Sequence, residues 1–112
     1  MILIVDDDVD SMMLMQKYLS EYAVSTCSSI DAVRILAQGK TNLLITDLAM
    51  PFVSGLELAR IAKNVHKVPV IAVTGYSSHS ERLHESRYID AVLQKPFTKL
   101  ELVDTVTKTL EL

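Results

Sequence analysis

Residues 2–8 read ILIVDDD, a short apolar run that ends directly in three carboxylates. The run Ile2–Val5 is apolar at odd and even positions alike, which is typical of a strand buried on both faces of a parallel sheet. Further runs of this kind lie at Ala23–Thr26, Leu43–Thr46, Val70–Val73 and Ala91–Leu93. The sequence therefore predicts five buried strands.

Segments with helical spacing separate these runs. The predicted helices are Val9–Glu21, Ser29–Gln38, Ser54–Asn64, Ser78–Arg87 and a last helix that opens at Thr98. Ser54 and Thr98 are each followed three residues later by Glu, the pattern of a capping box. Regular alternation of strand and helix predicts an α/β fold with a doubly wound, five-stranded parallel sheet flanked by five helices. The loops that follow the first, third, fourth and fifth strands converge if the strand order is 2-1-3-4-5, which is the flavodoxin-like arrangement.

The composition limits the class of protein. A chain of 112 residues, 49% of them hydrophobic, fits one domain over residues 1–112. Eleven basic and fourteen acidic residues argue against direct nucleic-acid binding. The single cysteine, Cys27, excludes an internal disulfide framework and a multi-cysteine zinc site. No apolar run approaches the roughly 18 residues of a membrane span. The N-terminus lacks the features of a signal peptide, so we expect no membrane partner and a cytoplasmic protein.

Polar side chains follow the predicted strands at one edge of the sheet. Asp6 and Asp7 follow the first strand, Asp47 the third, Thr74 the fourth and Lys95 the fifth. In open α/β sheets the functional site lies beyond the carboxyl ends of the strands. Crowded carboxylates repel one another unless a cation lies among them, and Mg²⁺ suits such a site. Carboxylates, a hydroxyl and an ammonium group together predict phosphoryl transfer to an aspartate.

In this order the motifs resemble those of a response-regulator receiver domain of the CheY-like type. The resemblance covers the whole chain. The residues that carry it are Ile2–Asp7, Asp47-Leu48-Ala49-Met50-Pro51 with Ser54-Gly55, Val73-Thr74-Gly75, and Lys95-Pro96-Phe97.

The resemblance implies a metal site and a phosphoacceptor. Asp47 is expected to accept the phosphoryl group and also to bind Mg²⁺, with Mn²⁺ as an alternative ion. Asp7 is expected to bind the metal directly and Asp6 largely through water, while Ala49 contributes its backbone carbonyl.

Two further residues complete the implied site. Thr74 is expected to be the switch hydroxyl, and Lys95 the partner of the phosphoryl group and of Asp47. The resemblance also implies a cis peptide bond before Pro96.

The function implied by the resemblance is a phosphoryl-accepting signalling switch rather than an enzyme. Its activities would be limited to self-phosphorylation from small donors and self-dephosphorylation. The expected donor is a sensor histidine kinase or a histidine phosphotransfer protein, and the output partner is unknown. The signal would change the surface of the last two helices and last strand, which could also form a homodimer. Val92 replaces the aromatic residue that the family usually has three positions before the Lys.

Two alternatives stay open at this point. The first is a Mg²⁺-dependent phosphohydrolase that forms an aspartyl phosphate, since Asp6-x-Asp8 resembles the start of its motif, although Asp10 replaces the expected Thr or Val. The second is a pseudo-receiver that binds partners without phosphorylation. It would be expected to lack one of the acidic pair, the acceptor or the lysine.

Overall fold

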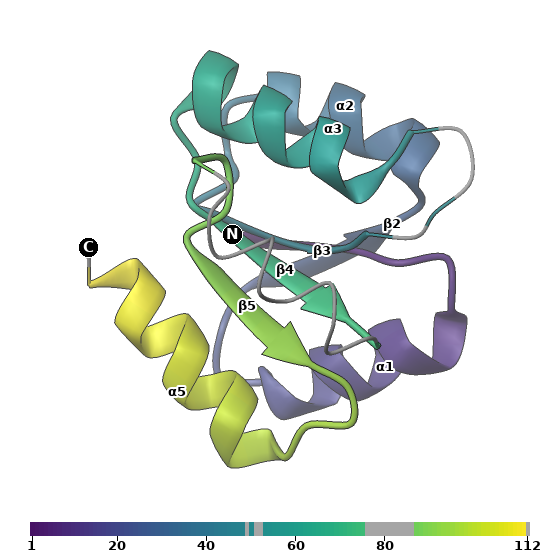
Figure 1. Cartoon of the computed structure of the whole chain (residues 1–112), viewed down its shortest axis with the longest axis vertical. Coiled ribbons are helices and arrows are strands. Elements are labelled where there is room, and N and C mark those ends of the chain that lie inside the picture. Colours follow the sequence, from purple (N-terminus) through teal and green to yellow (C-terminus); the bar gives the residue numbers. More distant parts are fainter. Residues whose placement is uncertain (49, 51–52, 76–86, 112) are drawn as a thin grey trace.

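The strands form one parallel sheet in the computed structural model, which describes residues 1–48, 50, 53–75 and 87–111 (Figure 1). The strands are β1 (Ile2–Val5), β2 (Val24–Cys27), β3 (Leu43–Asp47), β4 (Val70–Thr74) and β5 (Ala91–Gln94). Their order is β2-β1-β3-β4-β5, and every neighbouring pair is parallel. The predicted sheet and its order are confirmed, and each strand lies within one residue of its predicted bounds. The prediction of five buried strands is wrong for the edge strands β2 and β5, which are only partly buried and each of which has an exposed residue.

The described residues hold four of the five predicted α-helices. The helices are α1 (Val9–Tyr18), α2 (Ser29–Ala37), α3 (Gly55–Arg60) and α5 (Lys99–Leu110). A π-helical segment, η1 (Ile61–Val65), continues α3 within the range predicted as one α-helix. The predicted helix Ser78–Arg87 lies outside the described residues except for Arg87, which is in a turn.

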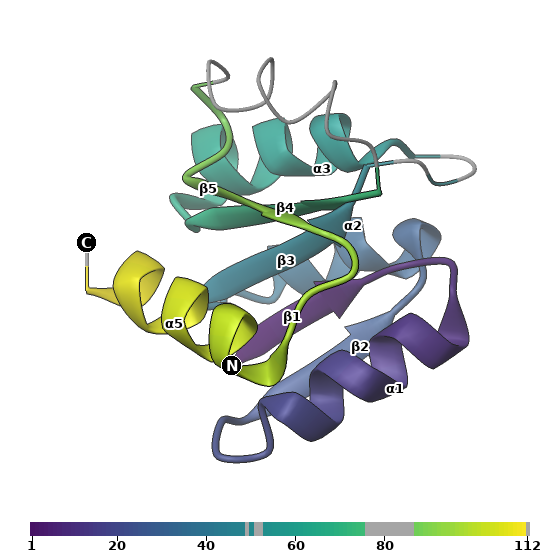
Figure 2. The ribbon, with the colours of Figure 1, turned by 60° about the horizontal axis from the view of Figure 1, so that its bottom comes forward.

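Helices cover both faces of the sheet. Figure 2 shows α1 and α5 on one face and α2 and α3 on the other. Because side chains alternate along a strand, each strand contributes to two apolar cores. Leu3 and Val5 pack with α2 and α3, whereas Ile2 and Ile4 pack with α1 and α5. None of the described helices has the length and apolar character needed to cross a membrane.

Side-chain caps fix where the helices begin. The Asp8 side chain accepts a hydrogen bond from the Asp10 backbone N–H at the start of α1. At α5 the predicted capping box is complete, because Thr98 and Glu101 each accept from the other's backbone N–H. At α3 only half of the predicted box forms. Ser54 accepts from the Glu57 N–H, but the Glu57 side chain pairs with Arg60.

Candidate functional site

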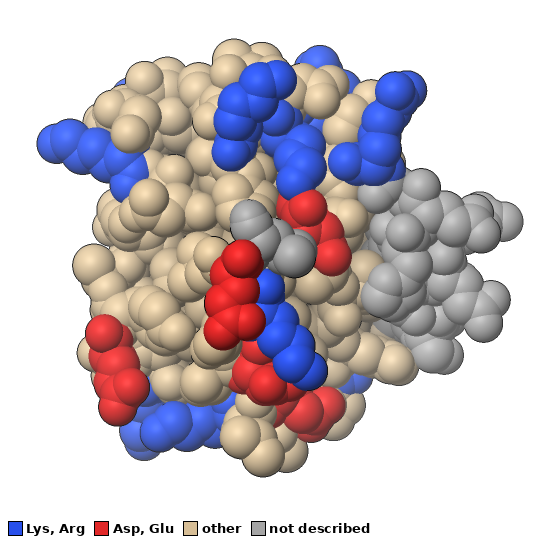
Figure 3. All heavy atoms as spheres, turned by 90° about the vertical axis from the view of Figure 1, so that its left-hand side faces the viewer, with Lys and Arg blue, Asp and Glu red and all other residues tan. Residues whose placement is uncertain are grey.

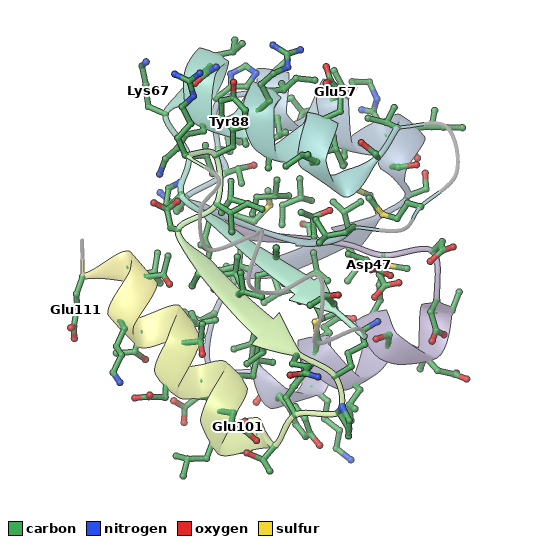
Figure 4. The ribbon with its side chains drawn as sticks, in the orientation of Figure 1. Asp47, Glu57, Lys67, Tyr88, Glu101 and Glu111 are labelled. Atoms are coloured by element: carbon green, nitrogen blue, oxygen red, sulfur yellow. The ribbon has the colours of Figure 1, made fainter. Side chains whose placement is uncertain are left out.

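The register of the sheet places the ends of neighbouring strands, and with them the predicted site residues, at the same height along the strand direction. Val5 is paired with Thr46, Asp47 with Val73, and Thr74 with Gln94. The residues at or just after these strand ends therefore lie side by side at the carboxyl edge. Figure 4 shows Asp47 at this edge.

Three carboxylates converge at the carboxyl edge. Asp6, Asp7 and Asp47 each offer an oxygen, and these oxygens all lie within 4.8 Å of one another. Asp6 is buried, Asp47 half-buried and Asp7 exposed, so the cluster opens to solvent on one side. Hard oxygen ligands at this spacing fit Mg²⁺, which usually keeps several waters when one or two carboxylates hold it. The donor set thus agrees with the predicted metal.

Buried Asp6 has hydrogen-bond partners for both of its carboxylate oxygens. Oδ1 accepts from the Asp8 backbone N–H at 2.9 Å, and Oδ2 accepts from the Lys95 Nζ at 3.2 Å. A buried carboxylate is costly unless it is paired and hydrogen-bonded, and these contacts meet that need. They also fix the direction in which Asp6 faces the cluster.

Asp47 is held by the backbone around it. Its Oδ1 accepts from the Leu48 backbone N–H at 2.7 Å, and its main-chain carbonyl accepts from the Thr46 hydroxyl at 2.8 Å. The other carboxylate oxygen, Oδ2, lies 3.8 Å from the Lys95 Nζ. Lys95 therefore reaches two of the three carboxylates, with Asp6 the nearer.

Lys95 and Thr74 are joined through the main chain. The Lys95 N–H donates to the Thr74 carbonyl at 2.8 Å, one step beyond the last paired residues of β4 and β5. Thr74 is buried, and the peptide bond between Lys95 and Pro96 is cis, as the resemblance implied. The ammonium group and the hydroxyl thus come from adjacent strand ends.

Gly55 supports the Asp47 loop in a way that sequence reasoning missed. A β-carbon at Gly55 would overlap the main-chain carbonyl oxygen of Asp47 and would lie 2.7 Å from the Leu48 Cα. The Gly55 N–H also donates to the Leu48 carbonyl at 3.2 Å. Only glycine allows this close approach of two backbones. Ser54-Gly55 stood out in the sequence as part of a motif, but nothing in it indicated this contact.

Of two further residues singled out in the sequence, Ala49 and Val92, the structure describes only Val92. Ala49, predicted to give its carbonyl to the metal, lies outside the described residues, and its role stays a prediction. Val92 is half-buried in β5 and packs against the core formed with α2 and α3. An aliphatic side chain therefore occupies the position of the usual aromatic ring.

Comparison with known proteins gives the family. Residues 2–107 match the sequence pattern of the response regulator receiver domain. The chain belongs to this family. The receiver domain is 29% identical over 114 residues to the heme response regulator HssR of Staphylococcus haemolyticus, covering 96% of the chain and 50% of that protein. It is 34% identical over 112 residues to an uncharacterized 14.6 kDa protein of Leptolyngbya boryana, covering 94% of the chain and 86% of that protein.

A solved structure agrees with this family assignment. The signal receiver domain of a signal transduction histidine kinase from Syntrophus aciditrophicus superposes with a TM-score of 0.84 at 27% identity. The match covers 98% of this chain and 89% of that one. A receiver domain is a regulatory domain of response regulators and not an enzyme in the usual sense. Because the receiver domain spans only half the length of HssR, the relative's full activity does not transfer to it.

Proposed function

We propose that this receiver domain is a phosphoryl-accepting switch in which Asp47 is the acceptor. The donor is a phosphohistidine of a sensor histidine kinase or of a histidine phosphotransfer protein. One observation supports this most strongly: three carboxylates lie within 4.8 Å of one another, and Lys95 contacts two of them. Such a site suits a cation, because the carboxylates repel one another without it. Once the cation is bound, it and Lys95 together can neutralise the negative charge of an incoming phosphoryl group.

The geometry favours one oxygen of Asp47 as the nucleophile. Oδ1 accepts from the Leu48 N–H, whereas Oδ2 faces the Lys95 ammonium group. In the transfer, Oδ2 forms a bond to phosphorus while the bond from phosphorus to the histidine nitrogen breaks. The imidazole keeps the bonding electrons and takes up a proton. We expect the Lys95 Nζ and the Thr74 hydroxyl to donate hydrogen bonds to the transferred phosphoryl oxygens.

Asp6, Asp7 and Asp47 are the side chains that would hold Mg²⁺, or Mn²⁺ in its place, with the Ala49 carbonyl as a further ligand. Both Asp6 oxygens already accept hydrogen bonds, which suits a contact through water, whereas Asp7 is exposed and suits direct binding. The bound ion would supply positive charge that offsets the negative charge of Asp47 and the incoming phosphoryl group.

The signal would leave the site through β5 and α5. An open groove between these elements is lined by Ala91, Val92, Asp104, Thr105 and Lys108, among others. Val92 has no aromatic ring to reorient, so we expect a displacement of backbone elements to carry the change in a two-state equilibrium. The same surface is where we place an output partner or a second copy of the chain.

Phosphorylation by acetyl phosphate, followed on a non-denaturing phosphate-affinity gel, tests the proposal. Wild-type protein should become phosphorylated only with Mg²⁺ present, and Asp47→Asn and Asp7→Ala should abolish the shifted band. Asp10→Asn is the matched control, because Asp10 is a nearby exposed carboxylate in the first turn of α1 outside the cluster. Full labelling of Asp47→Asn would refute the acceptor. An unlabelled wild type that still binds partners would favour the pseudo-receiver instead.

A further inference from the structure

Basic side chains gather at the amino edge of the sheet, opposite Asp47. Arg60 and Lys63 lie along the end of α3 and η1, Lys67 precedes β4, and Arg87 lies in the turn before β5. Figure 3 shows Lys and Arg side chains grouped over one end of this side of the molecule. In Figure 4, Lys67 and Tyr88 both lie away from Asp47, toward the other end of the sheet. We call these four cations the basic patch.

Contacts from neighbouring elements hold the basic patch together. Lys63 Nζ pairs with the carboxylate of Asp90, which also accepts from the Val70 backbone N–H at 2.8 Å. The Arg60 guanidinium pairs with Glu57. The Arg87 guanidinium lies 5.6 Å from the centre of the Tyr88 ring, a cation–π distance. Two of the four cations are thus fixed by carboxylates and one by an aromatic face.

Lys67 stands out because the chain bends there in a conformation that suits glycine. Its φ is 58°, the only positive value at a described residue other than glycine. It follows the last residues of η1, where helices usually end with Gly or Asn. The Val68 N–H donates to the Ala62 carbonyl at 2.9 Å and closes the turn through the main chain alone. The turn therefore does not need a lysine, and Lys67 combines an exposed charge with a backbone conformation that is strained for a non-glycine residue.

We propose that the basic patch is a docking surface for an acidic segment of a partner protein. Charge complementarity supports this occupant: within the described ranges no carboxylate pairs with Lys67 or Arg87. Binding to a nucleic-acid backbone is less favoured, because its strength depends on many phosphate contacts and the chain carries a net charge of −3. The surface lies at the opposite edge from the phosphoacceptor, so docking and phosphoryl transfer can occur together.

Fluorescence anisotropy with a labelled peptide that alternates Glu with Gly and Ser tests the proposal. A matched peptide with Gln for Glu and a short DNA duplex serve as comparison ligands. Lys67→Gly is the decisive variant, since it removes the charge and relieves the backbone strain. Its thermal midpoint should equal or exceed that of wild type, while its affinity for the acidic peptide should fall roughly threefold. Lys17→Gln, an exposed lysine on α1, is the control and should bind as wild type does.

The affinity for the acidic peptide should fall as the NaCl concentration is raised. In NMR spectra, the backbone amide chemical shifts that change on addition of the peptide should belong to residues 60–67 and 87–90. Unchanged affinity of Lys67→Gly would overturn the proposal. Equal binding of the Gln peptide would do the same, and shifts confined to the carboxyl edge would place the interaction elsewhere. Tighter binding of the DNA duplex than of the acidic peptide would assign the surface to nucleic acid instead.

Discussion

The absence of a side chain at Gly55 lets its backbone pack directly against the backbone of Asp47. Because a β-carbon at Gly55 would overlap the Asp47 carbonyl oxygen, Gly55→Ala must move the backbone at Asp47 and Leu48. We expect a loss of about 1–3 kcal/mol in the free energy of unfolding, as for other overpacked sites, and slower phosphorylation by acetyl phosphate. Urea denaturation and gel-based labelling measure the two effects. Gly75→Ala is the matched control for stability, since a β-carbon there meets no atom of the described residues within 4 Å. Equal stability of the two variants would contradict this explanation.

Cys27 is a residue whose environment predicts low reactivity. Burial is the main cause that raises the pKa of its thiol to about 11; nearby Asp31 adds to the rise, and Arg34 opposes it. Alkylation by iodoacetamide should therefore be slow at neutral pH and should accelerate only as the pH approaches 11. The unfolded thiol ionises first, so the free energy of unfolding should fall as the pH rises above about 8.5. Cys27→Ser should lack this component of the pH dependence. A folded thiol that reacts with a midpoint near its unfolded value would contradict the assigned burial effect.

At the scale of elements, α5 and α2 begin with caps of different quality. Thr98 and Glu101 form both hydrogen bonds of a capping box, whereas the Ser28 side chain makes no cap hydrogen bond to α2. Thr98→Ala should lower the free energy of unfolding by about 1 kcal/mol. Ser28→Ala should cost clearly less, because no cap bond is lost. Urea denaturation of both variants measures the difference, and equal losses would show that the box does not stabilise α5.

Strands were more predictable from sequence than helices, for a physical reason. A strand buried on both faces is mostly apolar, as β1 is at all four positions, although β3 and β4 also bury Thr46 and Thr74. Helical spacing carries less information about where a helix ends or changes pitch. The π-helical bonding of η1 leaves the residue pattern unchanged, so the sequence predicted one continuous α-helix there.

The candidate site was predictable to the extent that it depends on strand ends. Asp6, Asp47 and Lys95 lie at or directly after strand ends, and a parallel sheet must bring such positions to one edge. The pairing within the site was not predictable, because side-chain distances decide that Lys95 lies nearer Asp6 than Asp47. The Gly55 contact depends on the path of two backbones, which no local pattern records.

At the scale of the whole molecule, the acidic cluster exists only in the folded chain, since β1 and β3 must pair to form it. Mg²⁺ should therefore bind the folded state preferentially and raise the thermal midpoint. At ten times its Kd, the ion should add about 1.4 kcal/mol to the free energy of unfolding. Differential scanning fluorimetry with MgCl₂, against choline chloride at equal ionic strength, measures the shift, and EDTA should reverse it. Asp7→Asn should respond much less than wild type. An equal rise in both proteins would place the ion outside the cluster.

The two apolar cores, one on each face of the sheet, limit where the chain can gain or lose residues during evolution. Leu3 faces one core while Ile2 and Ile4 face the other, so deleting a single strand residue would exchange the contributions of that strand to both cores at once. An insertion in a connecting segment leaves unchanged which face of the sheet each strand side chain points to. Lineages descended from a common ancestor should therefore differ in the length of their connections, while the spacing within β1, β3 and β4 stays constant.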